Sequence, residues 1–175
     1  MPPAEPRPLR FGLSASSARS VAEWTELARR VEASGFDVFL QSDHLVPTLS
    51  PFSSLAHIAA VTDRLRVGTL VLDNDLRHPV ITAREAASLD VLSGGRAELG
   101  LGAGHMRQEY DEVGVDFEHP AVRVRRLEEA VPIVRQLLDG QTVHHTGDHS
   151  SLRCGTARAR DRVPQRHVRW RARRR

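Results

Sequence analysis

Several residue types are scarce or absent, and each absence narrows the class of protein. The chain has no lysine, so all 25 of its basic residues are arginine. Its single cysteine, Cys154, excludes an internal disulfide framework. No apolar run approaches the roughly 18 to 20 residues of a membrane-spanning helix, and the first residues lack the basic-then-apolar order of a secretory signal. We therefore expect a cytoplasmic protein with no membrane partner.

The net charge of +3 hides an uneven distribution along the chain. Residues 153–175 contain ten arginines and one acidic residue, Asp161, whereas residues 1–152 carry more acidic than basic side chains. An arginine-rich segment attracts nucleic-acid phosphates in a salt-dependent manner. The body of the chain is acidic, however, and shows no recognised nucleic-acid-binding motif. We therefore expect no specific nucleic-acid partner.

Residues 153–175 also show neither a strand period nor a helix period. Arginine without lysine indicates a GC-rich gene, and shifted reading frames of such genes tend to encode Arg, Ala, Pro and Gly. We interpret residues 1–152 as the folded domain and residues 153–175 as a disordered, Arg-rich tail that a frameshift would explain. Cys154, alone in this tail, is assigned no role.

Residues 1–152 alternate short apolar runs with amphipathic stretches. Strands are expected over residues 9–15, 37–41, 65–72 and 96–104, and helices over 20–34, 51–62, 79–92 and 120–138. A polar loop is expected between Gly104 and Pro120, and a small hairpin over residues 142–152. The strands are nearly continuous apolar runs, which is typical of a parallel sheet covered by helices.

Two architectures contain repeated strand–helix units. A doubly wound sheet usually carries G-x-G-x-x-G after its first strand, but this chain has "SASSARS" there. A (β/α)₈ barrel needs about 250 residues. The fold class expected is therefore α/β, a partial TIM (β/α)₈ barrel with about the first four βα units, a small hairpin and an irregular C-terminal tail. Its open edges predict self-association.

Functional side chains of parallel α/β folds lie at the carboxyl ends of the strands. The residues there that can carry chemistry are Ser14, Ser16, Asp43, His44, Asp73, Asn74, Asp75, Arg77, His78, Gly102, Gly104, His105, Gln108 and Glu109. The pair Asp43 and His44 is the best candidate, because an imidazole beside a carboxylate can transfer a proton to a bound ring. The alternative is that both side chains satisfy loop backbone groups. The glycines of residues 100–104 would allow close approach of a flat ligand, or would end the strand.

Two other clusters are given structural interpretations. His144, His145, Asp148 and His149 suggest a metal site, but neighbouring side chains of a strand point to opposite faces, so we expect no metal. The charged residues Arg123, Arg125, Arg126, Glu128 and Glu129 are expected to form a solvated helix face.

Three motifs agree in order and spacing with one known family. These are "SDHL", then "LRVGTLVL" followed by "RHP", then "REAASLDVLSGGRAELGLGAG" followed by "EYDEVG". From about Leu9 to Leu152 the chain resembles the N-terminal half of luciferase-like monooxygenases, in particular actinobacterial coenzyme F420-dependent oxidoreductases. The resemblance implies a (β/α)₈ barrel that moves a hydride between a deazaflavin, or alternatively FMN, and a small-molecule substrate.

The resemblance also implies roles for individual residues. Asp43 and His44 would face the ring, with His44 as the proton donor or orienting group. Leu70 and Val71 match a place where the family often has a non-proline cis peptide, and Gly104, His105 and Gln108 match positions that line the ring. The sugar-phosphate dehydrogenases of the family have glutamate in place of His105 and tryptophan in place of Thr48, so their substrate is not transferred to this chain.

The expected fifth strand and the later loops that hold the cofactor's phosphate tail have no counterpart in residues 153–175. Two hypotheses follow for the chain itself. It is either a hydride-transferring enzyme or a non-catalytic half-barrel fragment, and an arginine-tail nucleic-acid binder is a weaker third alternative.

Overall fold

The computed structural model describes residues 9–155 and 169–172. Its main sheet is wholly parallel and has the order β1-β2-β3-β5, with β4 and β8 also paired to β5. The strands are β1 (Gly12–Ser14), β2 (Val38–Gln41), β3 (Arg66–Thr69), β4 (Leu72–Asp73), β5 (Ala97–Gly102) and β8 (Arg169–Ala172). A separate antiparallel hairpin consists of β6 (Val143–Thr146) and β7 (Ser151–Cys154).

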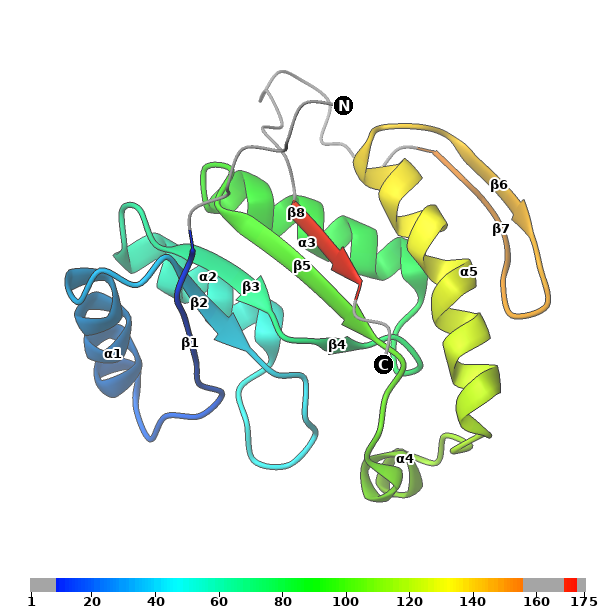
Figure 1. The fold of residues 1–175 in the computed structure, drawn as a ribbon, viewed down its shortest axis with the longest axis horizontal. Helices are drawn as coiled ribbons and strands as arrows, with labels where there is room; N and C mark the ends of the chain where they lie inside the picture. Colours follow the sequence, from blue (N-terminus) through cyan, green and yellow to red (C-terminus); the bar gives the residue numbers. More distant parts are fainter. Residues whose placement is uncertain (1–8, 156–168, 173–175) are drawn as a thin grey trace.

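Helices follow the strands in the expected alternation. They are α1 (Val21–Ala33), α2 (Pro51–Val61), α3 (Pro79–Leu92), α4 (Arg107–Val113) and α5 (Pro120–Leu138). In Figure 1, α2 and α3 lie behind the sheet, and α1 and α5 lie toward its two sides. The strands run so that their carboxyl ends lie at the lower edge of this view, where α4 is found.

Local signals explain where the helices begin. The hydroxyl of Ser20 accepts a hydrogen bond from the Glu23 amide and so caps α1. Pro51, Pro79 and Pro120 each occupy the first turn of a helix, where a missing amide hydrogen costs no hydrogen bond. These three prolines set the starts of α2, α3 and α5 as the sequence predicted.

The core forms two clusters between the sheet and the helices. One is built on Trp24, Phe39, Leu55 and Ile58, and joins α1 and α2 to the central strands. The other includes Leu101, Leu137 and Val143, and joins α3 and α5 to β5 and to the hairpin. The helices therefore cover one face of the sheet continuously, as the wall of a barrel requires.

The α/β fold with a parallel sheet is confirmed, with two corrections. Residues 107–113 were expected in a loop but form α4. The expectation of an irregular segment after residue 152 is wrong for Arg153 and Cys154, which belong to β7, and for Arg169–Ala172, which form β8 beside β5. Backbone hydrogen bonds along an open strand edge make this pairing, and they need no apolar side-chain period. The remaining residues of the predicted tail lie outside the described part of the chain.

Within the described residues, no helix is long and apolar enough to cross a membrane.

Candidate functional site

A cavity of about 110 Å³ opens at the carboxyl ends of the parallel strands. Its lining residues are Ser42, Asp43, His44, Leu70, Val71, Leu72, Asp73, Gly104, His105 and Glu109. Of the residues that were expected to form the ring site, all except Gln108 line this cavity. The other strand-end candidates Ser14, Ser16, Asn74, Asp75, Arg77, His78 and Gly102 are not among its lining residues. The Gln108 side chain is exposed on α4 and donates a hydrogen bond to Glu112 over 2.7 Å, outside this cavity.

Asp43 is buried and fully engaged with its neighbours. Its two carboxylate oxygens accept hydrogen bonds from Arg77 over 2.6 and 2.9 Å, and Oδ2 also accepts one from the Asp73 amide over 3.0 Å. A bidentate arginine holds a carboxylate in one orientation. Asp43 therefore joins the loop after β2 to the loop after β4.

His44 contacts the cavity on one side and a buried carboxylate on the other. Its Nδ1 lies 3.0 Å from Oε1 of Glu109, which also accepts the Leu45 amide over 3.0 Å. The Glu109 side chain is only 4% exposed, whereas that of His44 is 29% exposed. The ring of His105 packs edge-on against that of His44, with centroids 5.6 Å apart. His44 is thus fixed at one nitrogen and accessible at the other.

The floor of the cavity is an irregular stretch between β3 and β4. The peptide bond between Leu70 and Val71 is cis, as the family resemblance implied. The partner register on β5 shifts by one residue across this stretch, from Val67 opposite Ala97 to Leu72 opposite Leu101, which is the mark of a β-bulge. The Leu70 side chain is 40% exposed and so presents an apolar surface at the cavity.

Two glycines of β5 make room for this bulge. A Cβ atom on Gly102 would lie 2.5 Å from Val71 Cγ2, and one on Gly100 would lie 2.5 Å from the Thr69 carbonyl oxygen. The glycine run therefore serves packing between strands at these two positions. Close approach to a ligand is not needed to explain them.

Gly104 has a different role. Its φ of +73° lies in the left-handed region, and a Cβ atom there would overlap the hydroxyl of Tyr110 and lie 2.6 Å from Asp73 Oδ2. Only glycine allows the backbone to pass this close to the two side chains.

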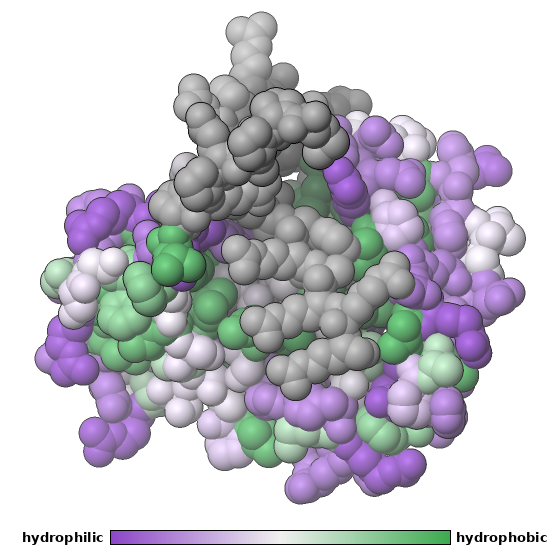
Figure 2. Space-filling model, viewed as in Figure 1, coloured by the Kyte–Doolittle hydropathy of each residue, from purple (hydrophilic) through white to green (hydrophobic). Residues whose placement is uncertain are grey.

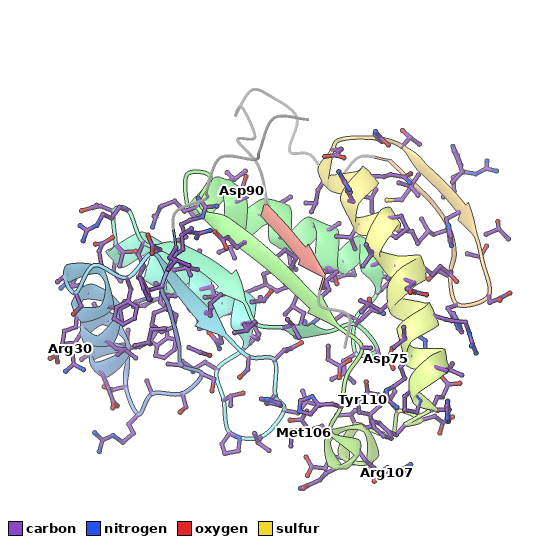
Figure 3. The ribbon with its side chains drawn as sticks, in the orientation of Figure 1. Arg30, Asp75, Asp90, Met106, Arg107 and Tyr110 are labelled. Atoms are coloured by element: carbon purple, nitrogen blue, oxygen red, sulfur yellow. The ribbon has the colours of Figure 1, made fainter. Side chains whose placement is uncertain are left out.

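Tyr110 joins two carboxylates behind the cavity. Its hydroxyl lies 3.0 Å from Asp73 Oδ1 and 3.3 Å from Asp75 Oδ2, and Figure 3 shows Tyr110 and Asp75 near each other at the edge of the sheet opposite Asp90. One hydroxyl has one proton, so it donates fully to only one of the two oxygens. Burial raises the pKa of Asp73, and the negative charges of Asp75 and Asp43 raise it further against opposing hydrogen bonds. Burial and the two carboxylates also raise the pKa of Tyr110.

Two arginines of α5, Arg123 and Arg126, complete this region, which corrects the expectation of a solvated helix face for these two residues, while Arg125 and Glu128 are exposed as expected. Arg126 pairs with Asp75 over 2.9 Å and also contacts Glu118. Arg123 is 6% exposed, donates to the Ala103 carbonyl over 3.2 Å and lies 3.9 Å from the centroid of the Phe117 ring. Sequence spacing alone could not show that loops from distant positions cover this face of the helix.

The histidine-rich hairpin has a structural arrangement. His145 Nε2 lies 2.9 Å from Oε1 of Glu129, whose other oxygen accepts the His149 amide over 3.1 Å. Among the residues that the structure describes, no group of three or more His, Cys, Asp or Glu side chains is arranged to hold a metal ion.

From the sequence, Glu109 and Asp73 are recognisable only as residues at strand ends, and Tyr110 is not recognisable as a site residue. Glu109 and His44 are 65 positions apart, and Tyr110 and Asp73 are 37 apart. The sequence "EY" in a polar stretch gives no local sign of these partners. The sequence feature that could have indicated Glu109 and Tyr110 is their position in the segment that follows a strand end.

Comparison with known proteins places this geometry in a family. The family model described as luciferase-like monooxygenase matches residues 8–169, beyond the Leu152 at which we expected the resemblance to end. An F420-dependent glucose-6-phosphate dehydrogenase of Microbacterium testaceum is 33% identical over 90% of this chain and 50% of its own length. The chain thus spans about half the length of the curated relatives it matches.

Solved structures with a similar fold also match this chain over about half of their own length. The coenzyme F420-dependent tetrahydromethanopterin reductase of Methanopyrus kandleri is 28% identical, with a TM-score of 0.70 over 85% of this chain and 45% of its own. A 3,6-diketocamphane monooxygenase component from Pseudomonas putida, solved in complex with FMN, is 20% identical to this chain. Its TM-score is 0.68 over 84% of this chain and 43% of its own length, and this likeness concerns the fold alone. The described chain therefore corresponds to a partial barrel.

Proposed function

Because this chain belongs to the luciferase-like monooxygenase family, we propose that its cavity is one wall of the ring site of an oxidoreductase that uses coenzyme F420. The observation that carries the proposal is the meeting of His44, Leu70, Val71 and Gly104 in one cavity at the carboxyl ends of the strands. The F420-dependent relatives share this half of their chains with the protein. The expected cytoplasmic location stays a prediction.

The side chains present fit one face of a flat, partly polar ring. Leu70 supplies an exposed apolar surface, while His44 and His105 supply polar edges beside it. The cavity volume of about 110 Å³ is smaller than the roughly 300 Å³ or more of a complete ligand pocket. The described residues therefore form one side of such a site and leave the other side open.

In this proposal the cofactor would accept or donate a hydride at its ring when bound. Leu70, in the bulge between β3 and β4, would pack against the ring face. Asp43, locked by Arg77, would hold the loop that carries His44. His44 would exchange a proton through Nε2 with the bound substrate or ring, since its Nδ1 is occupied by Glu109.

A fluorescence titration with F420 tests the proposal, with the variants His44→Ala and His57→Ala compared side by side. His57 lies on α2 and contacts Thr25, away from the cavity, which makes it a matched control. We expect His44→Ala to weaken F420 binding about five- to tenfold, as the loss of one hydrogen bond implies, and His57→Ala to leave it unchanged. Equal F420 affinities of His44→Ala and His57→Ala would refute the assignment of the cavity as part of the F420 ring site.

FMN is the alternative cofactor, because the resemblance to luciferase-like monooxygenases implies either a deazaflavin or FMN. A parallel titration with FMN distinguishes the two cofactors, because the cofactor of this site should have the lower dissociation constant. The non-catalytic fragment is the alternative for activity, because the chain spans about half of its relatives. It predicts that the purified chain does not bind F420 at micromolar concentration, so binding in a titration followed by absorbance would exclude it.

A further inference from the structure

We propose that Glu109 is a positioning residue that holds neutral His44 in the tautomer with the proton on Nδ1. The observation is the shared contact of Glu109 Oε1, which lies 3.0 Å from both His44 Nδ1 and the Leu45 amide nitrogen. This inference rests on the proposed function only in giving His44 a catalytic role. The tautomer itself is a property of the chain without cofactor.

The direction of the His44–Glu109 hydrogen bond follows from the second contact of the same oxygen. A backbone amide can only donate, so Oε1 must be an acceptor toward Leu45. An ionised carboxylate oxygen can accept two hydrogen bonds, and it then receives the proton of Nδ1 as well. Had Glu109 been the donor, Oε1 would have to carry a proton while accepting the amide. The structure therefore favours Nδ1 as the protonated nitrogen of the neutral ring.

The charged surroundings of His44 agree with this arrangement. Glu109 on α4 faces Nδ1, and the ring of His105 packs edge-on at 5.6 Å. Asp73 lines the same cavity, while Asp43 is engaged by Arg77. Glu109 is thus the carboxylate in hydrogen-bonding contact with the imidazole among the described residues.

The consequence for chemistry is that Nε2 keeps its lone pair. A neutral imidazole has one donor and one acceptor nitrogen, and the hydrogen bond made by one fixes the role of the other. With Nδ1–H directed at Glu109, His44 can accept a proton at Nε2, and it donates one there only after it has been protonated. Without Glu109, Nε2 would be free to hold the proton in the neutral ring and would no longer be committed to accepting one.

The experiment is a two-bond ¹H–¹⁵N spectrum of the imidazole rings of the full chain at alkaline pH, where histidine is neutral. The variant His44→Gln identifies the His44 signals by their loss. We expect the wild-type chain to show the Nδ1–H pattern at His44, and Glu109→Ala to shift the tautomer ratio toward Nε2–H by about tenfold or more, as the loss of a hydrogen bond to a charged group implies. An Nε2–H pattern in the wild-type chain overturns the proposal even if Glu109→Ala fails to fold.

Two further variants separate positioning from general structural support. Glu109→Gln keeps an amide oxygen that can accept from both Nδ1 and the Leu45 amide, so it should retain the Nδ1–H pattern. Glu112→Gln changes an exposed residue of the same helix, whose partner is Gln108, and should also leave the pattern unchanged. A shift in Glu112→Gln equal to that in Glu109→Ala would assign the effect to α4 as a whole and overturn the proposal. The tautomer result is independent of F420 titration, so failure of one does not imply failure of the other.

Discussion

Replacing Gly104 by alanine is expected to destabilise the site through two separate costs. The left-handed backbone, with φ of +73°, costs a residue with a Cβ atom about 1 to 2 kcal/mol. The new Cβ atom would also overlap the Tyr110 hydroxyl and so displace it from Asp73. Loss of that hydrogen bond to a carboxyl group adds about 1.5 to 3 kcal/mol. The free energy of unfolding should therefore fall by about 2.5 to 5 kcal/mol in urea denaturation.

Gly114 provides the matched control for this substitution. Its φ is +71°, yet a Cβ atom there would meet no atom within 4 Å. Gly114→Ala should therefore cost only the backbone term of about 1 to 2 kcal/mol. Adding Tyr110→Phe to Gly104→Ala should recover part of the loss, because the overlapping hydroxyl is gone. Equal losses in Gly104→Ala and Gly114→Ala would refute the account of Tyr110.

Three other predictions concern charge and surface. Asp73 has a raised pKa in the folded chain, so its contribution to stability is present below its ordinary pKa of 3.8 and is lost as the pH rises through the folded value. As the pH rises from below 3.8 to neutrality, the unfolding free energy of Asp73→Asn should therefore increase relative to that of the wild type. Urea denaturation at a series of pH values measures this difference, and a difference that does not change with pH would contradict the prediction. Arg77→Met should lower the unfolding free energy by about 3 kcal/mol, because it leaves the buried Asp43 carboxylate without its partner. Adding Asp43→Asn to Arg77→Met should restore part of the lost unfolding free energy. No recovery in the double variant would argue against a stabilising Arg77–Asp43 ion pair. The edge beside β1 exposes Leu9 by 85% and Phe11 by 64%, and Figure 2 shows hydrophobic surface on that side. Phe11→Ser should weaken self-association in sedimentation velocity, whereas unchanged association would exclude this edge as the contact.

The sequence predicted the main helices because their signals are local. Pro79 and Pro120 mark helix starts, and α3 and α5 also end at Leu92 and Leu138 as expected. Helix α4 was missed because its seven residues, "RQEYDEV", show too short an apolar pattern to distinguish a helix from a polar loop. Strand β8 was missed because its pairing with β5 is a matter of backbone hydrogen bonds between residues far apart in sequence.

The same distinction holds for the candidate site. Strand ends are predictable from apolar runs, so the sequence could place Asp43, His44 and Gly104 at one edge of the sheet. Which side chains meet there depends on loops and on α4. The contact between His44 and Glu109, and the burial of Arg123, are set by tertiary packing that no local pattern records. Family resemblance supplied what local patterns could not for the Leu70–Val71 peptide, whose cis geometry is confirmed.

The most direct test of the central claim is to map the binding of F420 on the backbone amide resonances of the full chain. A second titration with a deazaflavin ring that lacks the phosphate tail isolates recognition of the ring. Both ligands should shift the amides around His44, Val71 and Gly104, and leave those around Asp90, at the opposite end of the sheet, unchanged. Shifts confined to the Asp90 end, or none at the cavity with either ligand, would contradict the assignment of this cavity as the wall of a ring site.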